Sequence, residues 1–169
     1  TLNHPLFPTI GSRQSANVDL TGGPLGGDGK FVKYTVDGSW WLPIGVAGGS
    51  DTPGTGTTFA IGMTMRMGAL QGNSRSFPFD GFWMGGVQFG QQLRGYSETT
   101  VTPLGYFDED ARTINDIARI GHAFYSMTTE VAMRLGAQAS ASLFMDAGSV
   151  WENAADIDPS QLYRGAGIG

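Results

Sequence analysis

Arg94 and two carboxylates, Glu130 and Asp146, are the residues whose types and positions best suit a specific charge interaction. Both carboxylates fall on the polar side of segments that alternate between polar and apolar residues, whereas Arg94 lies in a long stretch without such alternation. A guanidinium presents a planar fork of donors that two carboxylates can share. Arg94 is therefore the natural counter-charge for Glu130 and Asp146.

Other patterns that could support chemistry are weak. The glycine-rich stretch Gly22–Lys30 lacks a phosphate-binding motif, because Pro24 and Phe31 stand where that motif requires other residues. No Gly-x-Ser-x-Gly nucleophile elbow occurs. The chain has no cysteine, its two histidines are far apart, and its short acidic runs at 108–110 and 156–158 are typical of solvated loops. We expect no enzymatic activity, no cofactor and no metal site.

Composition narrows the class of protein further. The formal net charge is -5, and no basic cluster offsets it, so a nucleic-acid partner is not expected. No stretch of about 18 apolar residues is present, which argues against a transmembrane helix. Glycine is abundant, with 27 residues, while charged residues make up only 15%. That balance is typical neither of a helical protein nor of a disordered one.

Long alternating segments are the elements that must position the charged residues. Their apolar and polar faces separate cleanly with a period of two, which indicates β-strands. These strands are about ten residues long or more, whereas strands of soluble proteins average five or six. Length and alternation together predict an all-β, antiparallel transmembrane β-barrel. The predicted strands cover 12–21, 31–42, 57–70, 122–133 and 137–151, and a sixth begins near Tyr163.

The connections fit a meander of hairpins. Glycine-rich segments at 22–29 and 45–57 predict turns or loops. A long loop, 71–121, has weak strand signal and a helix-like start at 108–120. Its aromatic and glycine content favours an ordered, functional loop. Aromatic residues near the expected strand ends predict girdles at the membrane interfaces: Trp40, Trp41, Phe82, Trp83 and Trp151.

The number of strands limits what this chain can form alone. Closing a barrel takes about eight strands. An open edge in lipid would leave backbone groups unsatisfied, at a cost of several kcal/mol each. We therefore expect residues 1–169 to be one portion of a larger barrel, with further strands on both sides.

Four stretches resemble the C-terminal half of a BamA-type barrel, from the superfamily of outer-membrane assembly and secretion proteins. They are similar to the opening of a mid-barrel strand, to the conserved loop motif, to the strand after that loop, and to an S-x-F-x-D-x-G-x-V-W strand. In chain order they are Asn3–Arg13, Phe82–Tyr96, Met127–Glu130 and Ser142–Trp151.

The resemblance implies a barrel of 16 strands whose long loop folds into the lumen and docks on the inner wall. Its loop-docking motif would comprise Gly85, Gly86, Leu93, Arg94, Gly95 and Tyr96, with Glu130 and Asp146 as lumen partners. In that motif Gly95 would allow a close approach to the wall, and Tyr96 would pack on it. Such a contact could brace the loop or also set the barrel's conformation. One departure is visible: six residues separate Gly86 from Leu93, where many members have fewer.

The function implied by the resemblance is the folding and insertion of other β-barrel proteins in the outer membrane of a Gram-negative bacterium. Partners would be the lipid bilayer, unfolded barrel clients and accessory assembly subunits. The soluble N-terminal repeats and the closing strand of the family are expected to lie outside this sequence. Three alternatives remain: a two-partner-type polypeptide secretion transporter of the same superfamily, a passive porin or adhesin barrel, and a soluble β-sandwich binding module.

Overall fold

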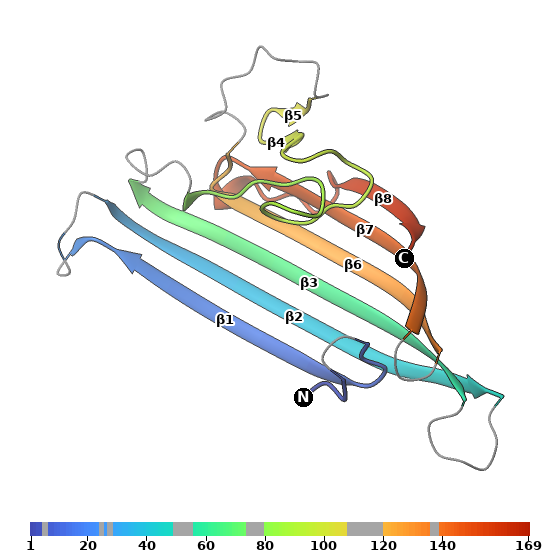
Figure 1. Ribbon diagram of the computed structural model, residues 1–169. Coiled ribbons are helices and arrows are strands. Elements are labelled where there is room, and N and C mark those ends of the chain that lie inside the picture. Colours follow the sequence, from blue (N-terminus) through green and yellow to red (C-terminus); the bar gives the residue numbers. More distant parts are fainter. Residues whose placement is uncertain are drawn as a thin grey trace.

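A single antiparallel sheet dominates the computed structural model, which describes residues 1–4, 7–23, 26, 29–48, 56–73, 80–107, 120–135 and 139–169. Six strands follow the order β1-β2-β3-β6-β7-β8, so each pairs with the next long strand along the chain (Figure 1). The sheet is open, with β1 and β8 at its edges. Its strands are β1 (Gly11–Thr21), β2 (Lys30–Ala47), β3 (Thr57–Asn73), β6 (Ala123–Leu135), β7 (Ala139–Trp151) and β8 (Tyr163–Ile168).

Among the described residues, no helix is long and apolar enough to cross a membrane.

The strands begin close to where the alternation predicts them, and three of them run further: β2 to Ala47, β3 to Asn73, into the predicted loop 71–121, and β6 to Leu135. β2 continues through Pro43 to Ala47, into the segment predicted as a loop from Gly45. Its register against β3 shifts between Pro43 and Gly45. Such a bulge lets a strand continue past a proline, which cannot donate a ladder hydrogen bond. The predicted loop start at Gly45 is therefore wrong by a few residues.

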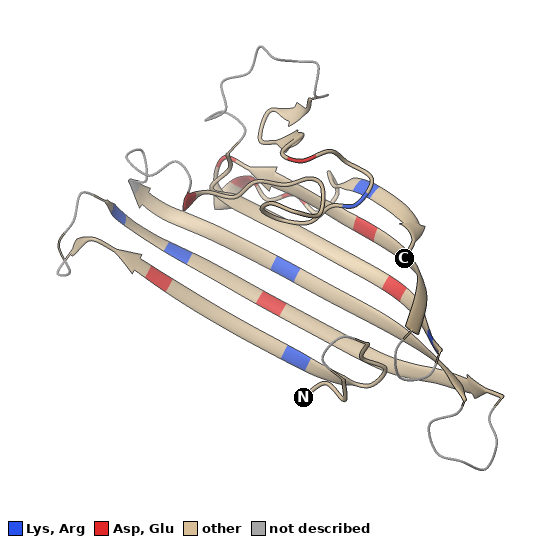
Figure 2. Cartoon of the chain, viewed as in Figure 1, with Lys and Arg blue, Asp and Glu red and all other residues tan. Residues whose placement is uncertain are grey.

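The two faces of the sheet differ in chemistry, as the alternation predicts. We call the face on which residues 80–107 pack the inner face. One row of paired residues across that face is Arg13, Ser39, Thr64, Thr128, Asp146 and Gly165. The outer face exposes apolar side chains, among them Val18, Leu20, Val36, Leu42 and Leu143. Charged positions are sparse along the strands (Figure 2).

Several aromatic residues lie elsewhere than predicted. Trp40 and Trp41 sit within β2 rather than at its end, and the Trp41 ring covers Gly62 on the neighbouring strand. Phe82 is buried on the inner side, with its ring centroid 4.6 Å from that of Phe124. Trp41 and Phe82 therefore lie on the inner side and do not form a girdle, whereas Trp40 lies on the outer face and is 39% exposed. Trp151 does end its strand, β7.

The described part of the long loop folds back over the inner face, across β6 and β7 (Figure 1). It carries two short strands, β4 (Val101–Thr102) and β5 (Gly105–Tyr106), which pair with each other. The loop and the wall share one apolar core, which consists of Phe31, Leu70, Phe82, Met84, Leu93, Val101, Phe124 and Val150. The loop is therefore ordered by burial. The helix-like segment predicted at 108–120 lies almost wholly outside the described residues.

Candidate functional site

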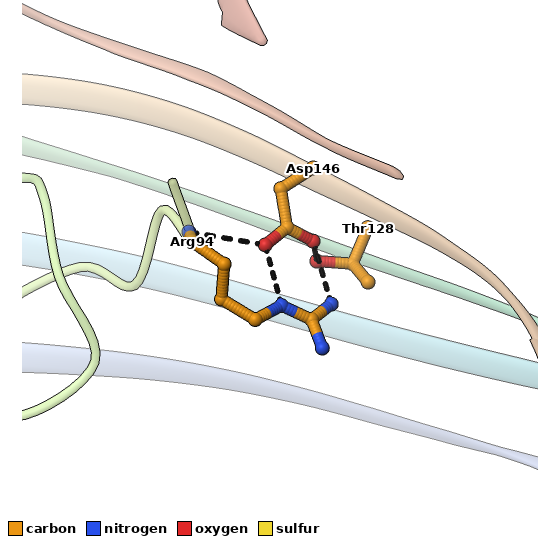
Figure 3. A network of polar contacts seen from close by, with 3 residues as sticks. All are labelled: Arg94, Thr128 and Asp146. Carbon is orange, nitrogen blue, oxygen red and sulfur yellow. Dashed lines mark hydrogen bonds and ion pairs between the residues drawn. The ribbon is translucent and has the colours of Figure 1, made fainter. Parts of the chain in front are cut away.

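Arg94 of the loop binds Asp146 on the inner face of β7 (Figure 3). Its Nε donates to Asp146 Oδ2 at 2.7 Å, and its Nη2 donates to Oδ1 at 2.8 Å. The backbone N–H of Arg94 also donates to Oδ2, at 3.2 Å. Thr128 on β6 donates its hydroxyl to Oδ1 at 2.8 Å. Four donors, three from Arg94 of the loop and one from Thr128 of β6, thus converge on one carboxylate, an arrangement we call the Arg94 pin.

The Arg94 pin lies under the loop and away from water. The Asp146 side chain is 2% exposed and that of Arg94 is 22% exposed. The Arg94 Cζ lies 3.3 Å from the ring centroid of Phe144, so the guanidinium rests on an aromatic face as well. Short, bidentate bonds in a shielded place are the strong form of an Arg–carboxylate interaction.

Glu130 contributes charge but no contact. It lies on the inner face of β6, paired with Phe144, two residue pairs along the ladder from Thr128 and Asp146. The expected second salt bridge, between Arg94 and Glu130, is not formed in the described part of the chain. Hydrogen bonding to Asp146 raises the pKa of Arg94, burial lowers it, and the charges of Asp146 and Glu130 raise it further. The guanidinium therefore stays ionised.

One close approach between loop and wall depends on a glycine on the wall. A Cβ on Gly165 of β8 would collide with the backbone oxygen of Arg94. At Gly95, by contrast, an added Cβ would only reach ordinary contact with Gly165, at 3.7 Å. Gly95 matters for a different reason, since its φ of +92° is one that side-chain-bearing residues rarely adopt. The close approach predicted for Gly95 is thus provided by Gly165.

Tyr96 extends the docking to β8. Its hydroxyl donates to the backbone oxygen of Arg164 at 3.0 Å and accepts from the Arg164 N–H at 3.1 Å. Its ring packs edge-on against Tyr106 and Tyr163, with centroid distances of 5.6 and 6.0 Å. The residues from Arg94 to Tyr96 therefore contact β7 and β8 together.

Comparison with known proteins agrees with this arrangement. The sequence profile of the Omp85 superfamily domain matches residues 1–169, the whole chain. The chain belongs to the Omp85 superfamily. Its fold is similar to that in the crystal structure of BamA from Haemophilus ducreyi lacking POTRA domains 1-3, with a TM-score of 0.68 and 22% sequence identity. The match covers 99% of this chain and 33% of the BamA chain, so this chain spans about a third of that protein's length.

The tip of this Omp85 loop is held by a residue that the motif does not include. The Glu98 carboxylate accepts hydrogen bonds from the backbone N–H groups of Val87, Gln88 and Phe89, at 2.7, 2.8 and 3.2 Å. Desolvation raises the pKa of Glu98, but these three hydrogen bonds outweigh it and lower that pKa. The contact organises the first residues of the six-residue spacer between Gly86 and Leu93.

The two glycines and the leucine of the motif build the turn that carries this tip. Gly86 has a φ of +64°, and a Cβ there would collide with the Glu98 carboxylate. A Cβ on Gly85 would likewise collide with the backbone oxygen of Ser97. Leu93 is fully buried, and its N–H donates to the Gly86 oxygen at 3.1 Å. The motif residues thus shape the turn, and Glu98 fills it.

Sequence reasoning missed four residues of the Omp85 site: Thr128, Phe144, Gly165 and Glu98. The alternation could have placed the first three, because each shares the inner face with Asp146 in the sheet register. Phe144 also stands two residues before Asp146 in the strand motif. Nothing in the local sequence around Glu98 distinguishes it from a solvated acidic residue.

Proposed function

We propose that this chain is part of an outer-membrane assembly factor that folds and inserts other β-barrel proteins, without catalysing a covalent reaction. Membership of the Omp85 superfamily and the likeness of the fold to BamA support this proposal. Its partners would be the lipid bilayer, unfolded barrel clients and accessory assembly subunits, in the outer membrane of a Gram-negative bacterium.

The Arg94 pin is the observation that carries the proposal. A passive pore needs an open lumen, and an ordered loop bonded to β7 and β8 works against that requirement. The bonds also link the wall to the loop, because one carboxylate receives donors from both. We propose that Gly85, Gly86, Leu93, Arg94, Gly95 and Tyr96 form a docking motif that sets the loop's position, with Asp146 as the contacted carboxylate and Glu130 as a neighbouring charge.

Reconstitution of the intact protein in phospholipid vesicles tests the proposal. An unfolded β-barrel client is added, and the folded fraction is followed by heat-modifiable migration in gel electrophoresis. The proposal expects faster client folding than with empty vesicles, and a slower rate with Asp146→Asn. Asp37→Asn is the matched control, because it makes the same change on the inner face outside the pin. Client folding no faster than with empty vesicles contradicts the assembly role.

The same vesicle experiment distinguishes an assembly factor from the two alternative functions, a secretion transporter and a passive pore. A polypeptide that becomes protease-protected inside the vesicles, without client folding, would identify a secretion transporter of the superfamily. Passage of small ions with neither activity would identify a passive pore.

A further inference from the structure

The hydroxyl of Tyr96 binds both backbone groups of a single strand residue. It accepts from the Arg164 N–H at 3.1 Å and donates to the Arg164 oxygen at 3.0 Å. A hydroxyl has one donor and free acceptor lone pairs, so one group can serve both. This is the pair of bonds that an opposing residue supplies in an antiparallel ladder.

The ladder between β7 and β8 shows which side of β8 these groups face. Ser142 and Gly169 exchange both of their backbone hydrogen bonds, at 2.8 and 2.9 Å. Bonded and non-bonded pairs alternate along an antiparallel ladder. The register pairs Asp146 with Gly165, which is therefore a bonded pair. Ala147 with Arg164 is then a non-bonded pair, and the N–H and C=O of Arg164 point away from β7.

β8 is the last strand in the sheet order, so those two groups lie on its free edge. Because every second residue of a strand directs its N–H and C=O to the same side, the backbone groups of Ala166 and Ile168 also lie on that edge. In lipid, unpaired backbone groups are costly, and an edge strand is a template for a further strand. The BamA chain is about three times as long as the part that this chain matches, so a barrel of that fold has further chain from which such a strand could come.

We propose that the Tyr96 hydroxyl sets the limit of strand pairing on the free edge of β8. The next strand of the same barrel pairs with Ala166 and Ile168 and stops short of Arg164, whose backbone groups are already bound. Tyr96 lies two residues from Arg94, so the Arg94 pin holds the hydroxyl in place. Release of the loop frees Arg164 and lets pairing extend along β8. The inference holds whether the protein assembles or secretes its clients.

Tyr96→Phe in the intact protein tests this inference, because it removes the hydroxyl and keeps the ring packing. Amide hydrogen exchange is measured residue by residue in lipid nanodiscs. The Arg164 amide is expected to exchange about tenfold faster, the equivalent of one lost hydrogen bond. The amides of Ala166 and Ile168 should keep their wild-type rates. Tyr106→Phe is the matched control, since it removes a hydroxyl from the same aromatic cluster and should leave Arg164 unchanged.

An Arg164 amide that exchanges equally slowly in wild type and Tyr96→Phe would overturn the inference, because another strand would then hold it. If Tyr96→Phe fails to fold, a structure of the intact wild-type protein tests the inference instead. In a structure of the intact barrel, backbone pairing of Arg164 with an added strand would overturn the limit, and pairing that stops at Ala166 would support it.

Discussion

Two Arg–carboxylate pairs lie on the same inner face of this sheet, and they differ in almost everything except residue type. Arg94 and Asp146 meet at 2.7 Å under the loop, with side chains 22% and 2% exposed. Arg66 and Asp37 meet at 3.4 Å on β3 and β2, with side chains 47% and 42% exposed. One pair joins segments 52 residues apart in the chain, and the other joins neighbouring strands of a hairpin.

The difference comes from what covers each pair. The loop covers the Arg94–Asp146 pair, whereas β1 to β3 border a cavity of about 480 Å³ lined by both Arg66 and Asp37. Coulomb attraction weakens as the surrounding dielectric rises, and exposed pairs also lose side-chain entropy when they form. Residue type alone therefore does not predict how much an ion pair contributes to stability. The loop makes the Arg94 pin strong, and the pin in turn holds the loop.

The largest effect is expected from Arg94→Ala. It leaves the Asp146 carboxylate buried without its main partner, which costs roughly 3–5 kcal/mol. Denaturant unfolding of the intact protein in lipid, followed by tryptophan fluorescence, measures the loss. Adding Asp146→Asn should recover part of the lost stability, because it removes the unpaired negative charge. A double variant whose loss equals the sum of the single losses would contradict a direct pairing.

The loop tip offers an intermediate case, a carboxylate near the surface that is nevertheless held by three amides. Because the folded pKa of Glu98 is lowered, its contribution is present above the ordinary Glu pKa and is lost as the pH falls through the lowered value. Amide chemical shifts of Val87, Gln88 and Phe89 should titrate together below the usual range for Glu. Glu98→Gln should abolish that titration. A midpoint at or above the ordinary value would show that these bonds are absent in solution.

The smallest effect is expected from Arg66→Gln. Exposed pairs contribute about 0–1 kcal/mol, so the unfolding midpoint should move little. The same denaturant measurement applies, with Arg94→Ala as the reference. A loss as large as that of Arg94→Ala would mean that β1 to β3 are also covered from water in the intact protein, and the contrast between the two regions would disappear.

The strands were predictable because alternation with a period of two is a local signal. The ranges expected for β1, β3, β6 and β7 fall within a few residues of the observed ones. The end of β2 was not predictable, because Pro43 and Gly45 indicate a loop. Only the pairing with β3 shows that a bulge accommodates these two residues within the strand. The aromatic residues were misplaced for a similar reason, since apolar character alone does not say whether Phe82 faces lipid or an internal core.

The sequence by itself determined the long two-faced strands, the inner-face positions of Glu130 and Asp146, and the place of Arg94 in a long loop between two strands. Those features depend on residue type and on the alternation of neighbouring side chains. Only the tertiary structure decided that Arg94 selects Asp146 and not Glu130, that it rests on Phe144, and that Gly165 makes room for it. Such choices depend on how a loop crosses three strands, and no local pattern encodes distances between segments so far apart in the chain.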